Sequence, residues 1–347
     1  MTTFSLIPLL WLVAAHRITR LAVDRTLPIT GQAIMFASMA IHMTLNVGGV
    51  ERALDSALIG TNTTVPVKFA VDGALCFGAS LIGIGLRARQ PGIRIAIHTI
   101  LAATTSLVAA VLFTTANPTL PPLDDYALEK IAVTIPRYSE AYAAAAVYPA
   151  IAGMYISAAL WPMVRTKFRR PRGLIAFWFG AVVLTVYAIL RCGYPLAVPY
   201  MSADHPGVFE LTRILALVGV GAMFAGVAYG TAYDALHARS QWRRFRALHA
   251  ELLDKWPGVA RTSSRFVATS EWVADRASEV LDAAFLDARE RGAGRGSARS
   301  ALIAASWLRD PGRPEAAGFG VQSLAPPDGV DASAWVAQIG KRWSQTK

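Results

Sequence analysis

The sequence predicts an all-α protein: a polytopic membrane bundle of seven transmembrane helices followed by a small cytosolic helical domain. Three observations support this fold class. Of the 347 residues, 54% are hydrophobic and only 16% are charged, whereas a soluble domain carries about a quarter charged residues. Long apolar segments recur along the first part of the chain, and the charges between them alternate in sign. After His237 the composition becomes that of an ordinary soluble domain.

The apolar segments define seven predicted spans. About 20 apolar residues are needed to cross roughly 30 Å of hydrocarbon. A segment in lipid must be helical, because no water is present to satisfy unpaired backbone groups. The windows that meet these requirements are 4–22, 29–50, 65–86, 95–115, 141–164, 174–194 and 213–236.

The first window is the most polar, because His16, Arg17 and Arg20 follow its apolar start. We expect these long side chains to reach a cytosolic interface by snorkelling. No Lys or Arg precedes the apolar stretch, so we expect a retained helix and not a cleaved signal peptide.

The segments between the spans predict the orientation. The first, third and fifth of them hold 11 Lys/Arg and one acidic residue, whereas the second, fourth and sixth hold 3 Lys/Arg and 8 acidic residues. Because positive residues accumulate on the cytosolic side, we expect a plasma-membrane protein with its N-terminus outside and its C-terminus in the cytosol. The 11 basic residues are Arg17, Arg20, Arg25, Arg87, Arg89, Arg94, Arg165, Lys167, Arg169, Arg170 and Arg172.

Charge density divides the chain into two predicted domains, 1–236 and 237–347. Each holds 17 Lys/Arg, with 11 and 12 Asp/Glu respectively, although the second is much shorter. Apolar residues at three-to-four spacing predict four short helices there, and such helices can form a small bundle. A domain of this size buries little core, so we expect it to pack on the membrane domain or on a protein partner. The predicted helices are 240–256, 270–290, 298–309 and 332–343.

No motif with a catalytic mechanism is present. The sequence contains no GxxxxGK[ST] phosphate loop, no HExxH, no paired Cys/His zinc spacing and no GxSxG elbow. We therefore expect neither an enzyme nor a bound cofactor or metal. Cys76 and Cys192 are too few for a disulfide framework, and we interpret both as small apolar fillers. The net charge of +11 reflects the basic segments between spans, so we expect no nucleic-acid partner.

Charged and protonatable residues inside the predicted spans are the candidate ligand or ion sites, because such groups are costly to bury in lipid. Lys68 and Asp72 are four apart on one helix face, which predicts an ion pair or, alternatively, a ligand or ion site. His42 is either a packing residue or a proton-responsive group. Arg191 either snorkels to the outer interface or faces an anionic ligand. His98 is interpreted as interfacial.

Two further patterns lie within the predicted spans. Tyr142, Tyr148 and Tyr155 recur about two turns apart on the fifth span, which is typical of a packing stripe or, alternatively, of an aromatic-lined cavity. Gly226 and Gly230 form GxxxG on the seventh span. This motif favours close helix packing, within the bundle or, as the alternative, in a dimer.

Three stretches carry a family resemblance: LDSALIGTNTTVPVKF at 54–69, RRPRGLIAFWFGAVVLTVYAILRCGY at 169–194 and EWVADRASEVLDA at 271–283. With them the chain resembles a group of uncharacterised actinobacterial multi-pass membrane proteins, some provisionally labelled as transporters. The resemblance implies a helical cytosolic C-terminal domain. It implies no catalytic residues.

Two functional hypotheses follow. The preferred one is a membrane sensor or scaffold whose cytosolic domain, 237–347, engages a protein partner. The alternative is a small-solute secondary transporter that uses His42, Lys68, Asp72 or Arg191, although the sequence shows no inverted repeat of the kind common in transporters. Convergence of these four residues on one water-accessible cavity favours transport, whereas separate positions favour the scaffold.

Overall fold

The structure is a computed structural model that describes residues 6–57, 62–87, 90–116, 120, 125–165, 173–201, 206–261, 269–294 and 296–345. Within these residues the elements are helices and no strand occurs, which confirms the predicted all-α class. The chain divides into two compact units, Met1–Gly230 and Thr231–Lys347.

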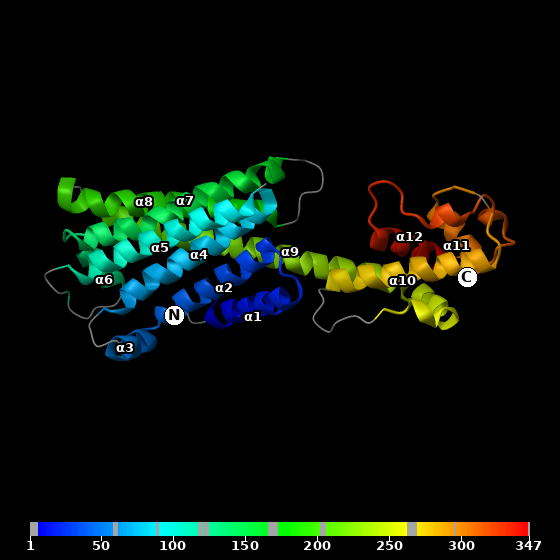
Figure 1. Cartoon of the computed structure of the whole chain (residues 1–347), viewed down its shortest axis with the longest axis horizontal. Helices are drawn as coiled ribbons and strands as arrows, with labels where there is room; N and C mark the ends of the chain where they lie inside the picture. The colour runs from blue at the N-terminus through cyan, green and yellow to red at the C-terminus, as the bar shows by residue number, and fades with distance from the viewer. Residues whose placement is uncertain are drawn as a thin grey trace. The chain divides into compact units, whose positions relative to one another are not determined.

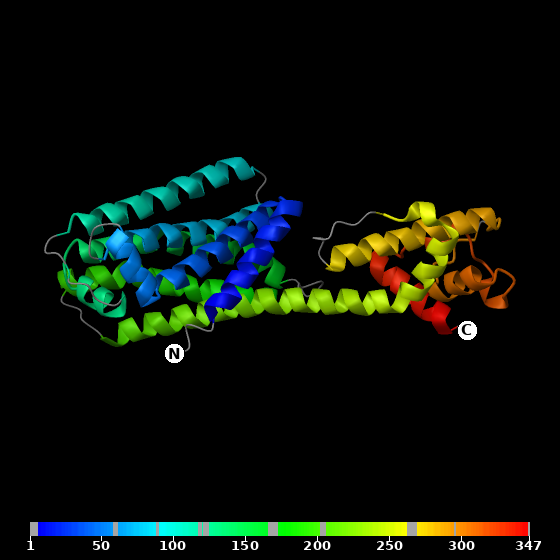
Figure 2. The same cartoon turned by 90° about the horizontal axis from the view of Figure 1, so that it is seen from below.

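The first unit is a bundle of long helices with two short ones (Figure 1). The short helices, α3 and α6, lie toward the same end of the bundle (Figures 1 and 2). The helices are α1 (Leu6–Val23), α2 (Leu27–Leu45), α3 (Gly48–Ala57), α4 (Thr64–Arg87), α5 (Pro91–Thr114), α6 (Asp125–Ala132), α7 (Tyr138–Arg165), α8 (Leu174–Met201) and α9 (Pro206–Lys255), which continues into the second unit.

Five of these helices are long and apolar enough to cross a membrane: α4, α5, α7, α8 and α9. A sixth candidate is α2 together with α3, although these two are bent by 88° at the break between them. These helices indicate a membrane protein with five or six candidate spans among the described residues. α1 is not among these candidates.

The outward faces of these helices are apolar, as expected of a lipid-facing surface. Of the five candidate spans, α5 is the least covered, and it lies at the edge of the bundle (Figure 2). Its exposed side chains recur at three-to-four spacing and include Ile93, Ile97, Ile100, Leu107 and Val111. A contiguous apolar surface of this kind is rare on a soluble protein, because exposing it to water is unfavourable. In a bilayer it faces hydrocarbon, so this free-energy penalty does not arise.

The second predicted span, 29–50, ends earlier than expected. α2 ends at Leu45, where the Asn46 N–H donates to the His42 carbonyl, and the chain turns into α3 at Gly48. Asn and Gly are poor helix formers, so the Asn46–Gly49 stretch is the physical reason for the break. The prediction of one continuous helix to residue 50 is therefore wrong, and neither α3 nor α6 was expected in the segments between spans.

The last helix is longer than the predicted span 213–236. α9 runs unbroken from Pro206 to Lys255, so the amphipathic stretch 240–256 is its final part and not a separate helix. It ends where Pro257 would interrupt the hydrogen-bond ladder. Gly230 and Thr231, where the two compact units adjoin along the chain, both lie inside this helix.

Small residues allow the helices of the first unit to approach closely. A Cβ on Gly78 of α4 would lie 2.6 Å from the Met35 nitrogen of α2, and one on Gly31 would lie 2.5 Å from the Gly78 carbonyl oxygen. The GxxxG residue Gly226 of α9 likewise meets the Phe177 nitrogen of α8, at 2.6 Å from an added Cβ. The predicted packing of this motif within the bundle is therefore confirmed for Gly226.

The second unit has its own hydrophobic core. The last part of α9 supplies Phe245 and Leu248, which are buried with Val280, Trp335 and Ile339 from later helices. The helices predicted at 270–290, 298–309 and 332–343 are confirmed, with shifts of a few residues at their ends. Its further elements are η1 (Pro257–Val259), α10 (Thr269–Glu290), α11 (Ala301–Arg309), η2 (Pro314–Ala316), η3 (Val321–Leu324) and α12 (Ala332–Gln345).

Candidate functional site in the first unit

The four predicted site residues lie in the first unit, and each has a polar partner. His42 and Asp72 form one pair: His42 Nδ1 on α2 lies 2.7 Å from Asp72 Oδ1 on α4. The carboxylate of Asp72 also lies within electrostatic range of Cys76, one turn further along α4, and of Tyr187 on α8. A histidine and a carboxylate at this distance form an ion pair when the imidazole is protonated.

Lys68 is paired with Glu51 and not with Asp72. The Lys68 ammonium lies 3.0 Å from Glu51 Oε1 and is almost wholly buried, while the Thr64 hydroxyl donates to the same oxygen at 3.4 Å. The predicted Lys68–Asp72 pair is therefore wrong. The reason lies in the tertiary structure. The bend after α2 places α3 against the start of α4, so that Glu51 pairs with Lys68. Asp72 pairs instead with His42.

A second carboxylate of α3 fixes this arrangement. Asp55 accepts hydrogen bonds from the Asn62 N–H at 3.1 Å, the Thr63 hydroxyl at 2.9 Å and the Thr64 N–H at 3.0 Å. Asn62 has a φ of 60°, a left-handed conformation that Asn tolerates better than most residues. Asp55 thus satisfies backbone donors at the start of α4 and holds α3, with Glu51, beside Lys68.

Arg191 on α8 is paired with Glu129 on α6. Its guanidinium also lies over two aromatic rings, 5.7 Å from the centroids of Tyr142 and of Tyr187. Cation–π contacts of this kind stabilise a cation away from bulk water. The anion that Arg191 faces is therefore a carboxylate of this chain.

None of the four residues lines the cavity that contains Tyr155. They form three separate pairs, His42–Asp72, Lys68–Glu51 and Arg191–Glu129. Tyr187 lies near two of these pairs, because it is within electrostatic range of Asp72 and its ring lies under the Arg191 guanidinium. Each pair neutralises a charge that would be costly in lipid. Of these pairs, His42–Asp72 is the one that contains a histidine, a residue type whose ordinary pKa lies near neutral pH.

The three tyrosines of α7 have different roles. Tyr142 packs edge-on against Phe69, with ring centroids 5.5 Å apart. Tyr148 is fully buried; its hydroxyl lies 3.3 Å from the Ser80 hydroxyl and 3.2 Å from His98 Nδ1. Tyr155 lines a cavity whose lining does not include Tyr142 or Tyr148. The packing interpretation therefore holds for the first two residues, and the cavity interpretation for the third.

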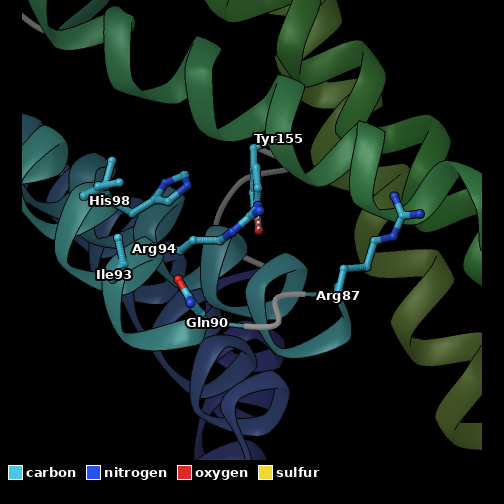
Figure 3. A pocket seen from close by; sticks show the side chains of 7 residues that line it. Arg87, Gln90, Ile93, Arg94, His98 and Tyr155 are labelled. Carbon is cyan, nitrogen blue, oxygen red and sulfur yellow. Dashed lines mark hydrogen bonds between the residues drawn. The ribbon is translucent and has the colours of Figure 1, made fainter.

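The cavity lies where α4 ends and α5 begins, beside the middle of α7, and has a volume of about 740 Å³. Figure 3 shows its lining residues. Arg94 Nη1 lies 3.4 Å from the Tyr155 hydroxyl, and Arg87 Nη1 donates to the Ala158 carbonyl at 3.3 Å. The lining is Arg87, Gln90, Ile93, Arg94, Ile97, His98 and Tyr155.

Sequence reasoning missed this cavity. It used Arg87 and Arg94 only as indicators of orientation and assigned His98 no partner. In the structure His98 is 6% exposed and its Nδ1 lies 3.2 Å from the Tyr148 hydroxyl. One signal was available: Arg94 and His98 are four apart, and a short connection joins them to Arg87. Tyr155 lines the cavity because α7 packs beside α4 and α5. This tertiary packing cannot be predicted from a local sequence pattern.

Among the described residues, no group of three or more His, Cys, Asp or Glu side chains is placed to hold a metal ion. Cys76 and Cys192 are both free thiols.

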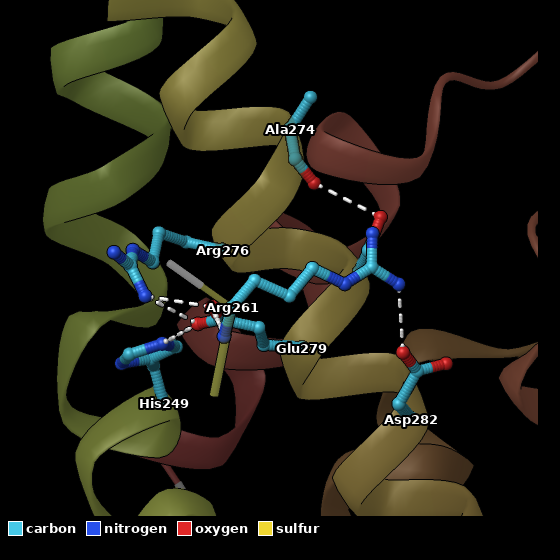
Figure 4. Close-up of polar contacts among 7 residues, drawn as sticks. His249, Arg261, Ala274, Arg276, Glu279 and Asp282 are labelled. Atoms are coloured by element: carbon cyan, nitrogen blue, oxygen red, sulfur yellow. Dashed lines mark hydrogen bonds and ion pairs between the residues drawn. The ribbon is translucent and has the colours of Figure 1, made fainter. Parts of the chain in front are cut away.

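In the second unit, a buried carboxylate joins α10 to two other segments (Figure 4). Glu279 is 0% exposed, and its oxygens lie 2.7 Å from His249 Nε2, Arg276 Nη1 and the Arg261 N–H. Burial alone would raise the pKa of Glu279, but the hydrogen bonds from Arg276, His249 and Arg261 outweigh it and lower that pKa below its ordinary value. Because its oxygens are occupied by this chain's own donors, Glu279 is a structural residue.

No protein-family model matches the chain, and it is not significantly similar to any curated protein or solved structure with which it was compared. Its function has therefore to be inferred from the arrangement of its own residues.

Proposed function

We propose that this protein is a sensor or scaffold of the plasma membrane, whose second unit lies in the cytosol and engages a protein partner. The observation that carries the proposal is α9. This helix begins with an apolar, membrane-compatible segment, and its last part supplies Phe245, Leu248 and Leu252 to the core of the second unit. α9 therefore joins the membrane-compatible segment to the second unit along the chain without an intervening loop.

The proposed topology has seven spans, with the N-terminus outside and the C-terminus in the cytosol. It requires α1 to cross, and 18 residues at 1.5 Å rise give about 27 Å, close to the hydrocarbon thickness. Leu9, Leu12 and Ile18 are exposed on α1, as a lipid-facing helix requires. The charge asymmetry supports the orientation, although Arg89, Lys167, Arg169, Arg170 and Arg172 lie outside the described residues.

The placement of the four membrane residues supports a sensor or scaffold over a transporter. Each is paired within the chain, and none of them lines the cavity beside Tyr155. A transporter needs a substrate group or coupling ion to reach such residues near the middle of the bilayer.

The test compares three forms of the protein in the native host. A chain that ends at residue 236 removes the second unit, and a full-length Phe285→Arg/Leu302→Arg variant alters two exposed apolar side chains of that unit. We expect both forms to reproduce the phenotype of a complete deletion while still inserting in the membrane. The full-length Gln322→Arg variant, which adds a charge at another exposed position, should behave as wild type. If the chain lacking the second unit keeps every wild-type phenotype, the proposal is wrong.

A small-solute secondary transporter is the second candidate, and the His42–Asp72 pair is the observation that favours it. A protonatable pair inside a bundle is the usual means of coupling transport to protons. Vesicles reconstituted with the full-length protein would take up a solute under a pH gradient, and Asp72→Asn would abolish that uptake. Absence of uptake across a broad solute panel would count against transport.

A further inference from the structure

The cavity between α4, α5 and α7 carries positive charge without a counter-charge. Arg87 and Arg94 line it together with His98, and no acidic side chain is part of the lining. Within the described part of the chain, neither arginine forms an ion pair, in contrast to Lys68 and Arg191. A site with two unneutralised guanidinium groups favours an anion.

Arg94 and His98 are held in place beside Tyr155 (Figure 3), whereas the Arg87 side chain extends away from them and its Nη1 donates to the Ala158 carbonyl of α7 at 3.3 Å. The Arg94 guanidinium lies 6.0 Å from the centroid of the Tyr155 ring and 3.4 Å from its hydroxyl. The ring of His98 lies 4.8 Å from that of Tyr155, and Tyr148 binds its Nδ1. Because these contacts immobilise the side chains before any ligand arrives, little side-chain entropy is lost on binding.

The start of α5 adds to the positive potential. α5 begins at Pro91, and Gln90 lines the cavity without capping the helix through its side chain. The partial positive charge of a helix N-terminus favours anions. A Cβ added to Gly92 would meet nothing within 4 Å, so the backbone of this first turn is accessible.

An apolar strip leads away from the charged groups. Ile93 and Ile97 line the cavity while remaining 60% and 50% exposed, and Ile100 continues the strip along α5 with 64% exposure. A phosphate bound by the arginines would therefore lie next to a surface suited to an acyl chain. This combination matches the basic pockets between membrane helices that hold anionic lipid headgroups.

We propose that this cavity binds a phosphate group, and that the headgroup of an anionic phospholipid supplies it. Arginine suits this role because its planar fork donates two hydrogen bonds to one phosphate. The proposed sensor or scaffold function does not require this site, so each can fail without the other.

Native mass spectrometry of the full-length, delipidated protein tests the proposal with three probes: dioleoylphosphatidylglycerol, dioleoylphosphatidylcholine and inorganic phosphate. We expect the anionic lipid to bind in preference to the zwitterionic one. The double variant Arg87→Gln/Arg94→Gln should weaken that binding by about fivefold for each arginine removed. Tyr155→Phe, which keeps the ring and removes the hydroxyl near Arg94, should have a smaller effect.

Arg165→Gln is the matched control. Arg165 ends α7, lies over the Trp161 ring at 5.9 Å and is not part of the lining, so its replacement removes one charge without altering the cavity. If inorganic phosphate displaces the bound lipid at millimolar concentration and binds in an Arg87- and Arg94-dependent way, the phosphate site stands and its source is soluble. If the double variant binds all probes as wild type does, or if Arg165→Gln causes an equal loss, the proposal is wrong.

Discussion

His42 on α2 and Asp72 on α4 are in direct contact, with His42 Nδ1 2.7 Å from Asp72 Oδ1. The two residues are 30 positions apart in the chain and come together because Gly31 and Gly78 let their helices approach closely. The pair therefore links α2 to α4 within the bundle.

We expect His42→Gln and Asp72→Asn each to lower the melting temperature of the full-length protein in detergent. Each single change leaves a partner without its counter-charge, whereas the double variant removes both. The coupling energy should be about 0.5–2 kcal/mol, the range of polar contacts between membrane helices. Strictly additive effects would show that the two side chains do not interact.

The close approach of α2 and α4 predicts that Gly78→Val is destabilising. Its side chain would meet the Met35 backbone, since even a Cβ lies 2.6 Å from the Met35 nitrogen. Overpacking of this kind costs about 1–3 kcal/mol, measurable as a lower melting temperature. Gly221→Val on α9 is the control, because a Cβ there meets nothing within 4 Å; an equal loss in both variants would contradict the packing.

In the second unit, Glu279→Gln should destabilise α10 far more than Asp282→Asn. Glu279 is fully buried among Arg276, His249 and the Arg261 amide, and removing one partner of a buried ion pair costs about 3–5 kcal/mol. Asp282 forms only an exposed pair with Arg261, which is worth at most about 1 kcal/mol. Hydrogen exchange of the α10 amides in the full-length protein measures both, and equal exchange in the two variants would contradict the assignment.

Acid should remove the contribution that ionised Glu279 makes to the stability of the wild-type protein. Because the pKa of Glu279 is lower in the folded state, its stabilisation is present above the ordinary value of 4.5 and is lost as pH falls through the folded-state pKa. Thermal unfolding of the wild type and Glu279→Gln, followed by tryptophan fluorescence, should show a gap at neutral pH that narrows below pH 4.5. A gap that widens on acidification would mean that the sign of the shift is wrong.

Much of the fold could be predicted from the sequence, because local signals specify it. The apolar windows that became α4, α5, α7 and α8 have few interruptions, and lipid permits only helices there. The break at Asn46 was not predicted because apolar residues continue to Val50. Gly48 and Gly49 are poor helix formers and were the one local indication of a break. The continuity of α9 was missed because its amphipathic end differs in composition from its apolar start.

The site could be predicted only as a set of residues. The free-energy cost of burying a charged or polar group in lipid identified Lys68, Asp72, His42 and Arg191 as candidates. Their partners, however, lie 17 to 62 positions away in the sequence. The i,i+4 rule predicted a Lys68–Asp72 pair because it considers one helix at a time. The partners Glu51 and Glu129 lie on α3 and α6, two short helices whose placement depends on tertiary packing.

The location of the second unit is the central claim, and cysteine accessibility in intact cells tests it most directly. In a chain with Cys76 and Cys192 replaced by Ala, single cysteines are placed at Ser344 in α12 and at Thr134 after α6, both exposed positions. We expect a membrane-impermeant maleimide to label Thr134→Cys in intact cells and Ser344→Cys only after permeabilisation. Labelling of Ser344→Cys in intact cells would place the second unit outside and contradict the account.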